Sequence, residues 1–186
     1  MANEENGDIS VALGIPMHGL QDELDWSKLR YGKVCVLADA DVDGYHIQVL
    51  LLTLFYRHFP QLISRGHVYV ARPPLYRLDV EASGKKRGAK KLYAMDDAEL
   101  NMWEERLRKE GYSKWRIGRF KGLGEMNPPE LFETTLRPDT RRLLPVQLPE
   151  ELRAEASSTF DNLMGKRNAA WRREWMERRG DEVDTY

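Results

Sequence analysis

The pattern of apolar and polar residues predicts a strand followed by a helix near the end of the first quarter of the chain. A continuous apolar run at 34–38 is rich in β-branched residues and follows a glycine, which is typical of a strand buried on both faces. A second run at 47–55 is longer and richer in leucine, which favours a buried helix. The residues between the two runs include Asp39, Asp41, Asp43 and Gly44.

Three acidic residues are therefore expected at the carboxyl end of a parallel strand, where open α/β sheets bind their ligands. Carboxylates crowded at one place repel each other unless some are protonated or a cation lies among them. Hard oxygen ligands without Cys or paired His favour Mg²⁺ over zinc. A simple turn is the alternative, since Asp and Gly are common turn residues. A turn alone does not require three acids at this spacing, so we expect one or two Mg²⁺ ions at Asp39, Asp41 and Asp43.

The rest of the chain mixes short strand patterns with helices. Further strands are expected at 67–71, 75–80, 114–120 and 141–148. Asp96 opens a capping box and a helix that runs to about Glu110. Asn127 as N-cap, followed by two prolines and by Glu130 at the third position, predicts a short helix to about Leu136. From Pro149 onward, apolar residues at three-to-four spacing describe an amphipathic tail helix or helix pair.

Composition limits the class of protein. With 186 residues and 41% apolar content, the chain can bury one core of ordinary size. Its net charge is −1, so any DNA contact must come from local basic clusters. Cys35 is the only cysteine, which excludes an internal disulfide and suits a reducing cytoplasm. No apolar stretch is long enough to span a bilayer, so we expect no membrane partner.

Two segments carry candidate phosphate contacts. The segment 84–91 places five basic residues in a loop with glycines, and both a solvated hairpin tip and contact with a phosphate backbone are compatible with it. The turn at 121–124 has two glycines, which permit close approach of the backbone to a phosphate. Arg77 could reach phosphate or could balance Asp79. The candidate residues of the loop are Lys85, Lys86 and Arg87.

Two other classes of site begin with a similar pattern of acids. In a calcium EF-hand counted from Asp39, the closing Glu position falls on Leu50, inside the apolar helix, which excludes that class. A dehalogenase-type phosphatase has Asp-x-Asp-Gly-Thr after a strand, so Asp41 would be its nucleophile. Tyr45 stands where that family has Thr, and Asp96 already has a capping role. A Mg²⁺-dependent phosphatase remains the alternative of a different class.

Three segments in order resemble the Toprim domain and following region of the B subunit of bacterial type II DNA topoisomerases. They read LADADVDGYHI at 37–47, RGHVYVARPPLYR at 65–77 and RFKGLGEMNP at 119–128. A C-terminal stretch at 163–181 is more similar to topoisomerase IV than to gyrase. The resemblance covers nearly the whole chain, and it implies an α/β fold with a partial, Rossmann-like Toprim parallel-sheet core and a helical C-terminal tail.

The resemblance also implies how the chain is divided and what its residues do. Residues 1–30 would be a leader with short helical pieces, 31–126 the C-terminal part of the Toprim domain, and 127–186 a mainly helical tail. The three acids would bind Mg²⁺ at a DNA cleavage and religation site. The residues expected to contact DNA phosphate are Lys121 and, with less support from the motif, Arg119, together with the basic loop.

Other parts of the active site are implied to lie elsewhere. The attacking tyrosine would come from the A subunit of topoisomerase IV, in an A2B2 heterotetramer in the bacterial cytoplasm; gyrase is the nearest alternative. The family also has a Glu in a Glu-Gly-Asp-Ser-Ala-Gly motif and ATP-binding domains upstream, and neither occurs in this sequence. We therefore expect a fragment that binds no ATP and performs no strand passage by itself.

Overall fold

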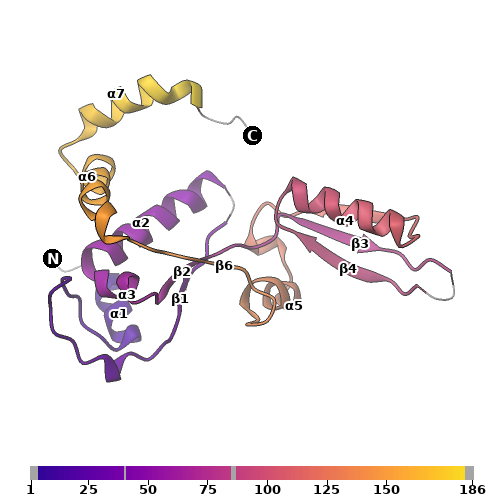
Figure 1. Cartoon of the computed structure of the whole chain (residues 1–186), viewed down its shortest axis with the longest axis horizontal. Coiled ribbons are helices and arrows are strands. Elements are labelled where there is room, and N and C mark those ends of the chain that lie inside the picture. Colours follow the sequence, from indigo (N-terminus) through magenta and orange to yellow (C-terminus); the bar gives the residue numbers. More distant parts are fainter. Residues whose placement is uncertain (1–3, 40, 85–86, 183–186) are drawn as a thin grey trace.

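The computed structural model describes residues 4–39, 41–84 and 87–182, and it shows two lobes joined by short segments (Figure 1). The first lobe holds a sheet whose strands are β1 (Val34–Val36), β2 (Val68–Ala71) and β6 (Leu143–Pro145). Its helices are α1 (Glu4–Leu13), α2 (Val42–His58) and α3 (Pro60–Ser64). The second lobe holds β3 (Tyr76–Val80), β4 (Lys90–Ala94), β5 (Trp115–Arg119) and α4 (Asp97–Lys109).

The sheet of the first lobe has the order β1-β2-β6. β1 and β2 are parallel, with Val34 opposite Val68, and β6 runs antiparallel to β2, with Leu143 opposite Ala71. The predicted strand, acidic turn and helix are therefore confirmed as β1, the loop after it and α2. The strand expected at 141–148 is also present, but it is only three residues long.

The predictions of a strand buried on both faces at 34–38 and of a buried helix over 47–55 are wrong. Within the described residues β1 is an edge strand, and Val36 is its one buried residue. On α2 the side chains of Val42, Ile47 and Leu50 are 82%, 51% and 46% exposed. The physical reason is size, because a sheet of three short strands covers only one side of a helix of 17 residues.

The core of the first lobe contains residues from before and after the acidic loop, which is the connection between β1 and α2 that carries Asp39, Asp41 and Asp43. Leu13 and Ile15, from the segment before β1, are buried in the same cluster as Phe55 and Phe59. Leu62 and Val68 complete its centre. The division at residue 30 stays a prediction, but the residues before it help to build the platform under α2.

The second lobe is an antiparallel sheet in the order β4-β3-β5, with α4 packed on one face. Leu78, Val80 and Leu107 are buried between sheet and helix. Asp96 caps α4 by accepting a hydrogen bond from the backbone N–H of Glu99 at 2.8 Å, as predicted. The pairing into a second sheet was not predicted, because strand patterns identify strands but not their partners.

The polypeptide then passes through α5 (Pro128–Leu131) and a π-helical turn at Phe132–Leu136 before it returns to β6. Short 3-10 turns lie at Trp26–Lys28, Leu123–Glu125, Glu150–Leu152 and Gly180–Glu182.

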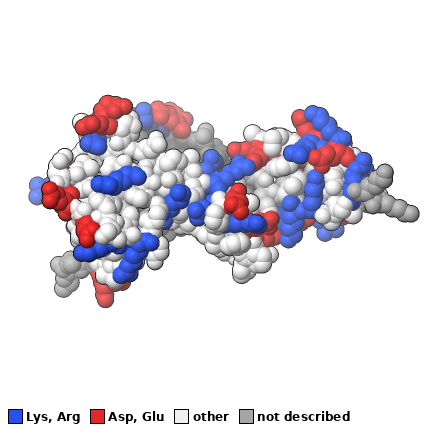
Figure 2. Space-filling model, turned by 60° about the horizontal axis from the view of Figure 1, so that its bottom comes forward, with Lys and Arg blue, Asp and Glu red and all other residues white. Residues whose placement is uncertain are grey.

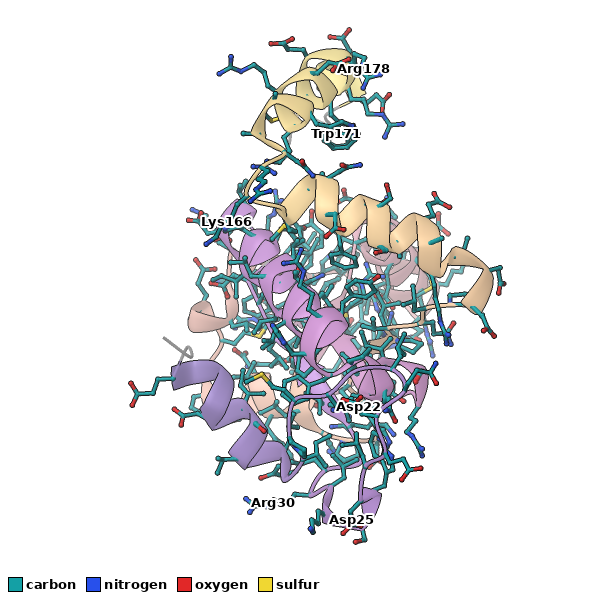
Figure 3. All side chains as sticks on the ribbon, turned by 90° about the vertical axis from the view of Figure 1, so that its left-hand side faces the viewer. Asp22, Asp25, Arg30, Lys166, Trp171 and Arg178 are labelled. Atoms are coloured by element: carbon teal, nitrogen blue, oxygen red, sulfur yellow. The ribbon has the colours of Figure 1, made fainter. Side chains whose placement is uncertain are left out.

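The tail is the predicted helix pair, α6 (Arg153–Met164) and α7 (Ala169–Arg179). Phe160 of α6 stacks on Tyr56 of α2 with ring centroids 4.4 Å apart, which attaches the tail to the first lobe. Trp171 and Trp175 stack on each other and, with residues of α6, line a groove between the two helices. Figure 3 shows Trp171 on the side of α7 toward α6. Among the described residues, no helix is both long and apolar enough to cross a membrane.

Candidate metal and DNA site

The acidic loop lies between the carboxyl end of β1 and the first turn of α2. Asp41 is the N-cap of α2, and its Oδ1 accepts the backbone N–H of Gly44 at 2.7 Å. Asp43 lies in the first turn and is exposed. The positive end of the helix dipole stabilises negative charge at both positions. The strand, the cap and the helix thus place carboxylates at the strand end, as the sequence predicts.

The glycine-containing turn at 121–124 meets the acidic loop through Asp39. The backbone N–H of Leu123 donates to Asp39 Oδ1 at 2.7 Å, across 84 residues of sequence. Gly122 packs so closely that a Cβ added there would lie 2.9 Å from Asp39 Cγ. Only glycine allows this approach without moving the carboxylate. The two motifs that sequence analysis singled out therefore form one site.

The donor chemistry of this site suits a hard cation. Oδ1 of Asp39 and Oδ1 of Asp41 each accept a hydrogen bond from a backbone N–H. The second oxygen of each carboxylate is the one that could bind a cation. In the described part of the chain, no group of three or more His, Cys, Asp or Glu side chains is arranged to hold a metal ion. Mg²⁺ commonly takes one or two carboxylates and several waters, so it does not need three converging side chains. Metal binding by Asp39, Asp41 and Asp43 therefore stays a prediction, with at most two of the three carboxylates on any one ion in this arrangement.

A pocket of about 240 Å³ lies beside Asp39 at the carboxyl ends of β1 and β2. Tyr45 and Gln48 of α2 line one part of it, and Arg72 and Leu144 line another. This is the position at which open α/β sheets bind ligands. The acidic loop thus borders a concave surface, with both a phenol and a guanidinium in its wall.

The candidate DNA contacts are placed unequally by the structure. Lys121 lies two residues after β5 and is exposed next to Gly122, which packs on Asp39. Arg119 is exposed at the end of β5, with its guanidinium 6.0 Å from the ring centroid of Tyr76. Figure 2 shows Lys and Arg side chains gathered where the two lobes meet. Basic side chains thus gather on this face of the molecule, as a local DNA contact on a chain of small net charge would need.

Only part of the basic segment 84–91 lies within the described residues. Lys85 and Lys86 lie outside the described residues. Arg87 donates to the carbonyl of Gly111 at 3.2 Å. Lys90 and Lys91 belong to β4 and form ion pairs, so they are not part of a free basic loop tip. A role of Lys85, Lys86 and Arg87 in DNA binding stays a prediction.

A dehalogenase-type phosphatase would need a late acidic pair, for which Asp96 and Asp97 are the candidates in this sequence, but both have other contacts in this fold. Asp96 caps α4, and Asp97 accepts a hydrogen bond from the hydroxyl of Tyr76 at 2.6 Å. Both carboxylates therefore hold the second lobe together. Nothing in their contacts directs them to the acidic loop.

An ion cluster around the buried carboxylate of Glu130 was missed from the sequence. Arg77 bridges to Asp79 at 3.0 Å, which confirms the balancing role considered for it, and also to Glu130 at 2.8 Å. The side chain of Glu130 is 5% exposed and also accepts from Lys91 at 3.1 Å. Burial would raise the pKa of Glu130, but the hydrogen bonds from Lys91 and Arg77 outweigh it and hold that pKa below its usual value. Sequence indicated only the helix-capping role of Glu130.

Comparison with known proteins agrees with this geometry. Residues 3–73, which contain β1, the acidic loop, α2 and β2, match the Toprim domain family. Residues 112–177 match the carboxyl terminus of the DNA gyrase B subunit. The fold and the site thus define a Toprim protein of the α/β class.

Relatives identify the kind of Toprim protein. The B subunit of DNA topoisomerase 4 from Salmonella typhimurium is 46% identical over 185 residues, and the match covers 99% of this chain and 27% of that protein. The Haemophilus influenzae protein of the same name is 47% identical over 186 residues, with 99% and 28% covered. The B subunit of DNA gyrase from Thermotoga maritima is 44% identical over 183 residues, with 98% and 26% covered.

The chain therefore carries the Toprim and carboxyl-terminal region of the B-subunit family of bacterial type II DNA topoisomerases. It spans about a quarter of the length of these relatives.

Proposed function

We propose that this chain supplies the Mg²⁺-binding and DNA-binding part of the DNA cleavage and religation site of topoisomerase IV. The observation that carries the proposal is the bond between Asp39 and the backbone of Leu123. It joins an acidic loop suited to a cation with a turn suited to a phosphate. Each half of such a site alone is a weak signal, but the two halves in contact have the parts that a phosphate-transfer site needs.

The residues of the chain have distinct roles in this proposal. Asp39, Asp41 and Asp43 hold one or two Mg²⁺ ions, with no more than two of these carboxylates on one ion and waters as the remaining ligands. A Mg²⁺ ion bound there supplies stabilisation of negative charge on a phosphate and on a leaving oxygen. Lys121 contacts a DNA phosphate from the turn, and Arg119 extends this contact along β5. Lys121 and Arg119 would thereby orient the phosphate for reversible transfer.

The partners follow from the kind of relative. The attacking tyrosine belongs to the A subunit of topoisomerase IV, and two A and two B subunits assemble around the DNA in the bacterial cytoplasm. ATP is used by another region of the full-length B subunit. Relatives from topoisomerase IV and from gyrase have similar identities, so the choice of topoisomerase IV rests on the C-terminal stretch at 163–181.

Asp41→Asn tests the metal site without disturbing the helix. Asn is as good an N-cap as Asp, so the cap of α2 is kept while one carboxylate is lost. In isothermal titration with Mg²⁺ we expect the Kd to weaken at least about tenfold, which corresponds to the loss of about 1.4 kcal/mol of binding free energy. The unfolding midpoint should stay unchanged.

A matched control removes an acid far from the loop. Asp161 on α6 is exposed and pairs with Arg57 at 3.3 Å, so Asp161→Asn should leave the Kd for Mg²⁺ unchanged. If Asp41→Asn binds Mg²⁺ as tightly as the unchanged chain, the proposed metal site is wrong.

A further inference from the structure

We propose that Arg77 is a positioning residue that holds both ends of the segment 120–130 and thereby sets the turn at 121–124 against Asp39. The inference rests on the proposed function for what the turn does, and on contacts of the second lobe for how it is held. Arg77 touches neither the acidic loop nor the turn in any hydrogen bond or ion pair among the described residues. It would act through its neighbours.

Arg77 projects from the face of the second sheet that α4 does not cover. Its neighbour in β3, Leu78, is fully buried against α4, and successive side chains of a strand point to opposite faces. Across the sheet Arg77 lies opposite Gly118 of β5 and Tyr93 of β4. Because Gly118 has no side chain, the face above β5 is open at this point.

The first end of the segment is held at Phe120. The guanidinium of Arg77 lies 5.9 Å from the ring centroid of Phe120, within the range of a cation–π contact. Phe120 is 9% exposed, and its backbone N–H donates to the carbonyl of Leu75 at 2.8 Å. The residue that precedes the turn is therefore fixed on the edge of the second lobe, with Arg77 beside its ring.

The second end is held at Glu130. Arg77 Nη1 donates to Glu130 Oε1 at 2.8 Å, while Asp79 binds the Nε and Nη2 side of the same guanidinium at 3.0 Å. Contacts on both sides of a planar guanidinium fix its orientation, which a lysine ammonium would not do. Glu130 is also locked to Asn127 by a reciprocal capping box. Arg77 therefore anchors the start of α5.

The residues between the two ends include Gly122, Gly124 and a 3-10 turn. Apart from the buried side chain of Met126 and the contacts of Gly122 and Leu123 with Asp39, they are held by local bonds, such as the one from the Lys121 N–H to Glu125 at 2.8 Å. The position of the whole turn therefore depends on where its ends are held. If Arg77 is lost, we expect the turn to shift, so that the hydrogen bond from the Leu123 N–H to the Asp39 carboxylate weakens. Lys121 would move together with the turn.

The full chain with Arg77→Met tests this directly, because methionine keeps much of the length and removes the charge. The readouts are hydrogen exchange of the Leu123 amide, the Kd for Mg²⁺ and the thermal midpoint. We expect Leu123 exchange to be about tenfold faster and Mg²⁺ binding to be several-fold weaker, with the chain still folded. Arg77→Lys should restore part of both, because it returns the charge to Glu130 without the planar contacts.

Lys90→Met is the matched control. It breaks the ion pair between Lys90 and Glu110 at 2.7 Å, in the same sheet but away from the segment 120–130. A merely structural role of Arg77 would lower the thermal midpoint in both variants and leave Leu123 exchange and Mg²⁺ affinity unchanged. That result would overturn the proposal.

A second variant covers the case in which Arg77→Met does not fold. Glu130→Gln keeps the shape and the capping acceptor but removes the charge, so it should also speed Leu123 exchange. Unchanged exchange in Glu130→Gln would overturn the proposal as well. If the unchanged chain binds no Mg²⁺, the proposed function fails, while Leu123 exchange still decides whether Arg77 holds the turn.

Discussion

Gly44→Ala is expected to destabilise the chain by at least about 2 kcal/mol, because the new Cβ would be forced into backbone rather than into a movable side chain. The added atom would lie 2.1 Å from the carbonyl oxygen of Asp39 and 2.9 Å from its nitrogen. Helix propensity alone predicts the opposite, since alanine inside a helix is favoured over glycine by up to about 1 kcal/mol. The sign of the effect therefore tests the close approach of α2 to the acidic loop.

The measurement is the free energy of unfolding in urea, with Gly32→Ala as the control. A Cβ at Gly32 would meet nothing within 4 Å, so that substitution should be neutral or stabilise by up to about 1 kcal/mol. Equal effects of the two substitutions would contradict the packing of α2 on Asp39.

Phe59→Ala is expected to cost about 3–5 kcal/mol, the range for truncating a fully buried phenylalanine. Phe59 is 0% exposed and lies at the junction of α2 and α3. The centroid of its ring is 5.9 Å from that of Phe55 and 5.7 Å from that of His18. It joins the segment before β1 to the helix that carries the acidic loop. Because whole domains are stable by only about 5–15 kcal/mol, this loss would be a large part of the total.

Urea unfolding also measures this effect, and another phenylalanine provides the control. Phe132 is 54% exposed after α5, so Phe132→Ala should change the free energy of unfolding by no more than about 0.5 kcal/mol. A loss below about 1 kcal/mol in Phe59→Ala would mean that the segment before β1 does not pack as described.

Local patterns predicted the elements of this fold but not their surroundings. The apolar runs identified β1 and α2, and Asp96 and Asn127 marked the first turns of α4 and α5. The burial of β1 and α2 was overestimated, because exposure depends on how many strands pair beside them. An apolar run has the same pattern at the centre of a sheet and at its edge.

The site was predictable only in part, because local patterns identify its motifs but not the contacts between them. The acids and the glycine turn stand out as local motifs, and the family resemblance implied that they lie together. The Asp39 to Leu123 bond itself spans 84 residues, and no local pattern encodes it. The sequence suggested a phosphate contact or a balance with Asp79 for Arg77, and a place in the first turn of a helix for Glu130. Their ion pair joins two elements separated by 53 residues, so no local pattern predicted it.

The most direct test of the central claim is Mg²⁺-dependent cleavage of a DNA duplex by a chimera. Residues 3–182 of this chain would replace the matching region of the B subunit of Haemophilus influenzae topoisomerase 4, which is 47% identical, and the chimera would be assayed with the A subunit of topoisomerase IV. We predict cleavage that requires Mg²⁺ and falls at least about 100-fold in Asp41→Asn. Equal cleavage by the chimera with and without Asp41→Asn would contradict the account. So would the absence of cleavage by the unsubstituted chimera under conditions in which the intact relative cleaves DNA.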